Sequence, residues 1–204
     1  MEYLILGFFT GLSLILAIGA QNIFVIEQGL KKQYVFLVCL ICSLSDLILI
    51  FIGIFLFEYF INLFTNNIEL IFNILLFIFL IYFIFNKIKF KYDDLNINLD
   101  ENKISLKNII TKTLGFTYLN PHVYSDTVFF LGNFSKNFLI TQKYFFGVGA
   151  SIASFLFFFC LGYLSKFLSK YLQNVKAWKT INLFIIFFMS ALAIFVLKDI
   201  LNFI

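Results

Sequence analysis

The sequence predicts an all-α integral membrane protein with six transmembrane helices, organised as one transmembrane domain over residues 1–204. Of the 204 residues, 62% are hydrophobic and only 13% are charged, whereas a typical soluble domain has about 25% charged residues. The mean hydropathy is +0.98. A transmembrane helix needs roughly 20 apolar residues, and runs of that kind occupy most of the chain. A separate soluble domain is therefore not expected.

The apolar runs locate the helices in order along the chain. Transmembrane spans are expected at residues 3–26, 34–57, 70–85, 108–131, 145–165 and 181–201. The first run follows the acidic Glu2 and has no clear cleavage pattern, so we expect a retained span rather than a signal peptide. Polar turns are expected near residues 28–33 and 58–69, and a cytoplasmic linker at about 87–107.

The distribution of lysine predicts the orientation. Of the 15 basic residues, all lysine, twelve fall in or beside the turns after the first, third and fifth spans. The other three, Lys136, Lys143 and Lys198, belong to the opposite side. Because positively charged loops stay in the cytoplasm, both termini should be periplasmic. The net charge of +4 then reflects orientation in the lipid bilayer, and no nucleic-acid partner is expected.

The linker divides the chain into two parts of three spans each, about residues 1–86 and 108–204. Because three is odd, the second part enters the membrane from the opposite side to the first. This arrangement predicts two inverted-topology repeats, which are common among secondary transporters.

Two spans are interrupted by residues that packing does not require. In the first span, Gly19 lies beside the amides of Gln21 and Asn22. In the fourth, Asn120 precedes Pro121 and His122, the only proline and the only histidine of the chain. Backbone groups freed at membrane depth persist only when they are buried in protein or line a wet cavity. Broken helices at corresponding places of two repeats indicate a binding site, although a simple proline kink is the alternative.

Two carboxylates are the second indication of a site. Asp46 lies near the middle of the second span, and Asp126 lies in the fourth. A charge at the bilayer centre costs about 2.5–3.5 kcal/mol on insertion scales. We therefore expect both side chains to face a shared aqueous cavity and to meet a cation there. The alternatives are pairing with a lysine such as Lys112, or reaching outward to water.

Other polar residues have simpler structural interpretations. His122 can carry a proton near neutral pH or make one structural hydrogen bond. Glu27 is expected at the membrane interface. Cys39 and Cys42 have redox-motif spacing but lie in an apolar helix without a βαβ context, so we expect them to pack as small apolar residues. No metal site, cofactor or catalytic residue is predicted.

Four blocks in order resemble the lysine exporter (LysE) family. They are residues 11–22 continuing to 27–32, Ser43-Leu-Ser45-Asp46 with Gly53, residues 118–126, and residues 178–182 through 189–193. The resemblance covers nearly the whole chain outside the linker. One departure is Ala20, where many members have proline. Without proline, a smaller bend in the first span is one of the geometries that the sequence allows.

The resemblance implies export of L-lysine or L-arginine across the bacterial inner membrane, driven by the proton gradient or the membrane potential. We expect a mechanism of alternating access, in which protons are a candidate coupling ion. The candidate substrate-binding or coupling residues are Gly19, Gln21, Asn22, Ser45, Asp46, Asn120, Pro121, His122 and Asp126. Open alternatives are export of a neutral amino acid such as homoserine or threonine, export of a small cation, an intramembrane enzyme, and a structural subunit. The oligomeric state is not predicted.

Overall fold

The computed structural model describes residues 1–16, 19–63, 66–89, 105–171 and 175–203, and every regular element in these ranges is a helix. The elements are α1 (Glu2–Ile15), α2 (Ala20–Lys31), α3 (Val35–Leu63), α4 (Asn66–Lys89), α5 (Leu106–Tyr118), α6 (Pro121–Tyr124), the π-helix η2 (Ser125–Phe130), α7 (Leu131–Ser135), α8 (Ile140–Leu168), the 3-10 helix η3 (Ser169–Tyr171) and α9 (Val175–Phe203). The prediction of an all-α fold is confirmed for the described residues.

Three helical stretches are long and apolar enough to cross a membrane, namely Val35–Phe57, Ile140–Leu168 and Lys179–Leu201. Helices α1 and α2 satisfy the same criterion together, although they are bent by 83° relative to each other. Leu70–Asn86 of α4 forms a shorter apolar helix. By length and composition, the described residues therefore contain three spanning helices, or four if the bent pair is one span.

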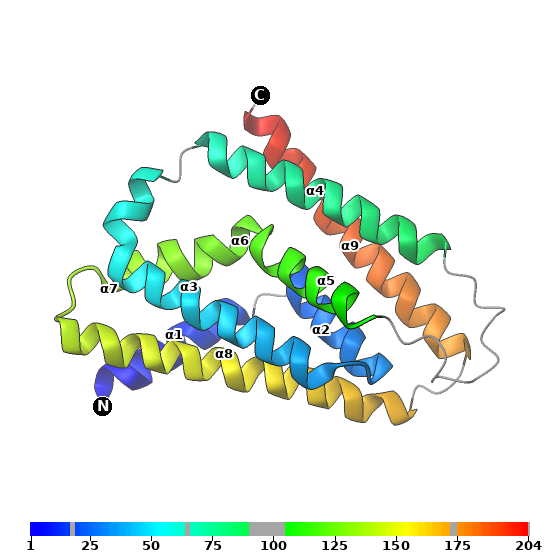
Figure 1. Cartoon of the computed structure of the whole chain (residues 1–204), viewed down its shortest axis with the longest axis horizontal. Coiled ribbons are helices and arrows are strands. Elements are labelled where there is room, and N and C mark those ends of the chain that lie inside the picture. The colour runs from blue at the N-terminus through cyan, green and yellow to red at the C-terminus, as the bar shows by residue number, and fades with distance from the viewer. Residues whose placement is uncertain (17–18, 64–65, 90–104, 172–174, 204) are drawn as a thin grey trace.

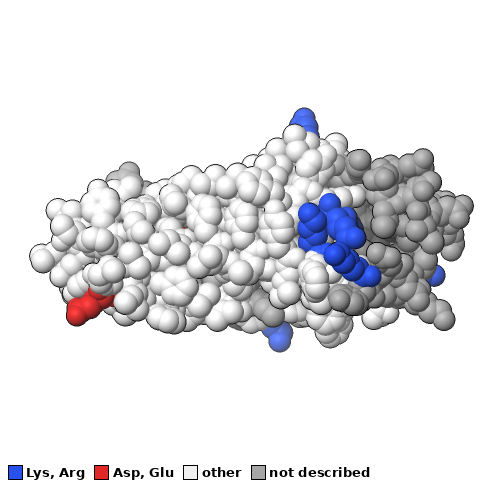
Figure 2. Space-filling view, turned by 90° about the horizontal axis from the view of Figure 1, so that it is seen from below, with Lys and Arg blue, Asp and Glu red and all other residues white. Residues whose placement is uncertain are grey.

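The helices alternate in direction along the molecule. Helices α2, α4 and α8 end at the same end of the molecule at which α3, α5 and α9 begin (Figure 1). That end carries the exposed side chains of Lys32, Lys107 and Lys166. Figure 2 shows lysines gathered toward one end of the face in view, with the acidic group in view near the opposite end. The lysine-rich turns predicted from the sequence thus share one end of the fold, which we call the Lys-rich end.

Helices extend further into the predicted turns than the sequence indicated. Helix α2 continues to Lys31, because Gly29 packs directly on α8, where an added Cβ would lie 2.5 Å from Gly162 O. The turn contracts to residues 32–34, with Lys32 in the left-handed region at φ 57°. Glu27, expected at the interface, is instead buried at 2% exposure and pairs with Lys31.

The other two expected connections are also shorter within the described residues. Helix α3 runs to Leu63 and α4 starts at Asn66, so most of the predicted turn at 58–69 is helical. Helix α5 starts at Leu106, where the Ser105 hydroxyl accepts a hydrogen bond from Asn108 N–H. Most of the predicted linker, residues 90–104, lies outside the described residues.

Small residues bring α1 against α8. A Cβ added at Gly7 would lie 2.0 Å from Phe146 O, and one added at Gly149 would lie 2.0 Å from Leu4 O. At Gly11 it would lie 2.9 Å from the Ala150 Cα. Close backbone approach at glycine is a common way for helices to associate in membranes. The contact fixes α1 on α8 and so positions the break that follows α1.

The cysteines are free, and Cys39 and Cys42 are fully buried. The Cys39 thiol donates to Phe158 O of α8 at 3.2 Å. Both thiols therefore belong to the packing between α3 and its neighbours.

Candidate functional site

The first helix break lies between α1 and α2. Helix α1 ends at Ile15 and α2 restarts at Ala20 with the extended Gly19 as its N-cap. The Asn22 side-chain Nδ2 donates to Ile15 O at 3.1 Å, which ties the end of α1 to the beginning of α2. The first backbone bond of α2 runs from Ile23 N–H to Gly19 O, so the preceding N–H groups of the helix lack acceptors within it. With a bend of 83°, this break is a sharp one even though residue 20 is alanine.

The second break lies between α5 and α6. Pro121 occupies the first position of α6, where a missing N–H and a fixed φ suit a helix start. The Asn120 side chain caps the helix by accepting from His122 N–H at 3.1 Å. On the other side of the break, Tyr124 OH donates to Tyr118 O at 2.9 Å. Proline therefore begins a new helical segment here, and the alternative of a simple kink in a continuous helix is not what the structure shows.

Asp126 follows in the π-helix η2. Single-turn π segments are rare and are frequently found at functional sites. Thr127, the next residue, donates its hydroxyl to Val123 O at 2.6 Å and so satisfies a carbonyl within the irregular helix.

The two breaks lie against each other. A Cβ added at Gly19 would meet Asn120 Nδ2 at 4.0 Å and no other atom of the described residues beyond its own neighbourhood in the chain. Residues about one hundred positions apart in the sequence are therefore neighbours, as expected if corresponding breaks build one site.

A cavity of about 440 Å³ lies at this junction, within the roughly 300–1,000 Å³ typical of small-molecule sites. Seven of the predicted site residues line it, namely Gly19, Gln21, Asn22, Asp46, Asn120, His122 and Asp126. Ser45 and Pro121 are buried but are not among the lining residues. Pro121 contributes by starting α6, whereas the structure gives Ser45 no contact with the cavity.

The carboxylates of the cavity differ in their surroundings. Asp46 on α3 is 3% exposed, and its Oδ2 accepts a hydrogen bond from Ser154 Oγ of α8 at 2.8 Å. Asp126 is partly exposed. Among the described residues neither carboxylate forms an ion pair, and the Lys112 ammonium lies over the Phe83 ring instead, 5.8 Å from its centroid. Pairing with lysine therefore does not account for these carboxylates.

Ser154 and the apolar part of the cavity wall were not predicted from the sequence. The missed lining residues include Leu76 and Leu80 of α4, Phe158 of α8, and Leu192, Phe195 and Val196 of α9. Apolar residues in a transmembrane helix carry no signal that separates cavity-lining positions from lipid-facing ones. Ser154 carries a weak signal, because it is a hydroxyl near the centre of an apolar helix.

The cavity combines two acidic side chains, amide groups and an apolar wall. The carboxylates supply negative charge for a cation, and the start of α2 presents N–H groups and the positive end of the helix dipole to an anion. Both features line one small cavity and together suit a ligand that carries charges of both signs.

Comparison with known proteins shows the family to which the chain belongs. The family described as LysE type translocator matches residues 12–199. The arginine exporter protein ArgO of Salmonella paratyphi C (strain RKS4594) is 33% identical over 186 residues, covering 91% of this chain and 88% of that protein. ArgO of Salmonella typhimurium (strain LT2) shows the same identity and coverage, and ArgO of Salmonella enteritidis PT4 is 32% identical. No solved structure matches the chain.

Proposed function

The chain belongs to the LysE type translocator family, and we propose that it exports a basic amino acid, L-arginine or L-lysine, from the bacterial cytoplasm. It is a multi-pass protein of the cell (inner) membrane. One observation carries the proposal: Asp46 and Asp126 line a single cavity at the junction of two helix breaks, without a lysine partner among the described residues. The names of its relatives as arginine exporters favour the same substrate class.

The proposed binding mode assigns each end of the substrate to one part of the cavity. Asp46 and Asp126 hold the cationic side chain. The backbone N–H groups at the start of α2, with the Gln21 amide, hold the α-carboxylate. The polar groups of Asn120 and His122 hold the α-amino group, and the apolar wall from α4 and α9 packs on the methylene chain.

The proposed topology is six membrane crossings in two inverted repeats with both termini in the periplasm. In this assignment, α1 and α2 form the first crossing and α5 to α7 form the fourth. The alternation of helix direction in Figure 1 and the lysines at one end support it. The proposed transport cycle rocks one repeat against the other, so that the cavity opens to each side in turn.

Coupling to protons gives the export direction. Moving one positive charge outward against an inside-negative potential costs about 2.3 kcal/mol per 100 mV. A carboxylate that binds either the substrate cation or a proton makes the exchange electrically neutral, since one charge moves each way. Asp46 is the proposed position of this competition, with His122 as a second group able to carry a proton.

Counterflow in proteoliposomes tests the substrate. Vesicles loaded with unlabelled arginine should accumulate labelled arginine and labelled lysine. Excess arginine or lysine should compete, whereas homoserine, threonine and a divalent cation should not. Competition by the neutral amino acids alone, or by the cation alone, would replace basic amino-acid export by one of the other transport functions.

A further inference from the structure

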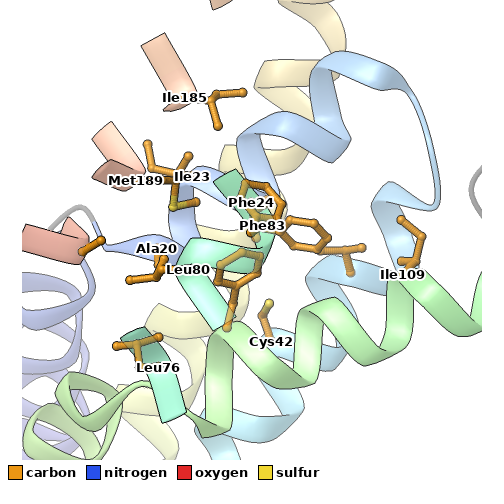
Figure 3. Packing of buried hydrophobic residues seen from close by; sticks show 14 of the residues in the cluster. Ala20, Ile23, Phe24, Cys42, Leu76, Leu80, Phe83, Ile109, Ile185 and Met189 are labelled. Carbon is orange, nitrogen blue, oxygen red and sulfur yellow. The ribbon is translucent and has the colours of Figure 1, made fainter. Parts of the chain in front are cut away.

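Four aromatic rings close the cavity toward the Lys-rich end of the molecule. They belong to Phe24 of α2, Phe79 and Phe83 of α4, and Phe116 of α5, and we call them the aromatic plug. Phe116 lies centrally, with its ring centroid 5.1 Å from that of Phe24, 4.8 Å from Phe79 and 5.0 Å from Phe83. Figure 3 shows Phe24 and Phe83 close together, with Leu80 and Cys42 nearby.

Four of the helical segments around the cavity reach a buried apolar residue one turn closer to the Lys-rich end. On α2 the step leads from Gln21 to Phe24, and on α4 from Leu80 to Phe83. Two further helices repeat it. On α3 the step leads from Asp46 to Cys42. From Asn120, which lies between α5 and α6, it leads back to Phe116 of α5. The four residues reached, Phe24, Phe83, Cys42 and Phe116, are 0–3% exposed. In contrast, His122 is exposed and Asp126 partly exposed. The side of the cavity toward the Lys-rich end is therefore lined by buried apolar residues, whereas two of its polar residues are at least partly exposed.

Gln28 lies one turn beyond the plug. It is 1% exposed, and neither its Oε1 nor its Nε2 has a hydrogen-bond partner among the described residues. Gln21, Phe24 and Gln28 are spaced i, i+3 and i+7, so they share one face of α2. The neighbouring face, with Val25 and Gly29, packs on Gly162 of α8 instead. Gln28 therefore continues the line that runs from the cavity through the plug.

We propose that Gln28 is a second substrate-binding position, on the far side of the aromatic plug from the cavity. It takes the zwitterionic head of the exported amino acid when the Lys-rich end opens. A primary amide fits this role because Nε2 donates to a carboxylate and Oε1 accepts from an ammonium. A buried amide without partners is unfavourable, so each such group in a native structure calls for an explanation. The inference rests on the proposed function and its orientation.

The test compares transport from the two faces of the membrane. Uptake of labelled arginine into inverted vesicles starts from the cytoplasmic face, and counterflow into right-side-out vesicles starts from the outer face. Gln28→Met keeps the length of the side chain and removes both hydrogen-bonding groups. We expect the arginine concentration for half-maximal uptake to rise about tenfold in inverted vesicles. In right-side-out vesicles it should change less than about twofold, within the usual effect of a neutral substitution.

Asn73→Leu is the matched control, because Asn73 on α4 is also buried and its Oδ1 also lacks a partner among the described residues. This variant should affect both vesicle orientations equally or leave both unchanged. Equal loss from both faces in Gln28→Met, or no change from either face, would overturn the proposal.

A second measurement does not depend on transport. Gln28→Cys is introduced after Cys39, Cys42 and Cys160 are replaced by alanine, and a membrane-impermeant maleimide is added to either type of vesicle. The thiol should react in inverted vesicles only, and amino acid should slow the reaction. A thiol that never reacts from the cytoplasmic face, or whose reaction no amino acid slows, would contradict a binding role there.

These experiments distinguish failure of the second binding position from failure of the proposed function. If the wild-type protein moves a neutral amino acid instead of arginine, the proposed substrate is wrong and the comparison of the two faces is made with that amino acid. If it moves none, the proposed function fails, and protection of the thiol introduced by Gln28→Cys, measured with the same amino-acid panel, still decides whether the second position exists.

Discussion

The Ser154 hydroxyl donates to Asp46 Oδ2 at 2.8 Å, and both side chains are buried where α8 meets α3. The bond connects residues 108 positions apart. It engages one carboxylate oxygen from the side of α8 and leaves the other oxygen for a ligand in the cavity. Ser154 thereby fixes the orientation of the charge that the proposed mechanism uses.

Ser154→Ala should weaken substrate binding more than it slows turnover. A hydrogen bond to a charged group contributes about 1.5–3 kcal/mol. Because a freed carboxylate can still meet the cation, we expect the smaller end of that range, an increase of about tenfold in the half-saturating arginine concentration. Ser154→Thr should restore most of the loss, because it keeps the hydroxyl. Transport kinetics in proteoliposomes measure both values.

Ser151→Ala is the control for that substitution. Ser151 lies one turn earlier on α8, is also buried, and donates its hydroxyl to Gly147 O of its own helix at 2.8 Å. Its loss should leave the half-saturating concentration unchanged. Similar losses in the two variants would show that Ser154 acts through the packing of α8 and not through Asp46.

Asp46→Asn should abolish counterflow of arginine while the protein remains folded. The substitution keeps the shape of the side chain and its ability to accept from Ser154, but removes the charge for the substrate cation. Loss of a buried charged partner costs about 2–5 kcal/mol of binding, which takes transport below about one-thirtieth of the wild-type rate. Asp199→Asn, a carboxylate of α9 outside the cavity lining, should transport normally. Unimpaired counterflow by Asp46→Asn would remove Asp46 from the mechanism.

The sequence was informative where a residue contradicted its membrane environment. Asp46, Asn120 and Pro121 are conspicuous in apolar runs because each is unfavourable in lipid, and the structure gathers the first two at one cavity with the third beside it. The same criterion did not separate Ser45 from Ser154, since the faces of α3 and α8 are defined only by tertiary packing. It also placed Glu27 at the interface, although that side chain is buried against Lys31 in the extended α2.

The helices that cover the cavity could not be predicted from composition. Helices α4 and α9 are mostly apolar, and Leu80 and Phe195 stand within apolar runs of them, so composition does not distinguish these two residues from residues that face lipid. The glycines were equally ambiguous. Gly7 and Gly149 prove to be contact points between α1 and α8, whereas Gly19 lies at a break where the nearest described atom to an added Cβ is Asn120 Nδ2 at 4.0 Å.

Gly149→Ala should destabilise the protein, and Gly19→Ala should not. A Cβ at Gly149 would lie 2.0 Å from Leu4 O and 2.9 Å from Phe8 N, so the backbones of α1 and α8 must separate. Overpacking of this kind typically costs about 1–3 kcal/mol. At Gly19 the nearest atom would be 4.0 Å away and φ is −111°, a conformation that alanine adopts without strain. The temperature of unfolding in detergent measures the difference, and equal values for the two variants would contradict the packing of α1 on α8.

Asn120→Ala should weaken the second break without unfolding the protein. Asn120 caps α6 through the bond that its Oδ1 accepts from His122 N–H at 3.1 Å, and loss of an N-cap side chain costs about 0.5–2 kcal/mol. For a chain of this size, a loss of about 1 kcal/mol lowers the unfolding temperature by about 2–4 °C.

Asn120→Ser separates the cap from the binding role proposed for the Asn120 amide. Serine is as good an N-cap as asparagine, so the variant should recover the unfolding temperature. It should not recover arginine binding, because serine lacks the Nδ2 group that lies 4.0 Å from the Cβ position of Gly19 in the cavity wall. Recovery of both properties by serine would assign Asn120 to the helix start alone and leave the α-amino group of the substrate to other residues.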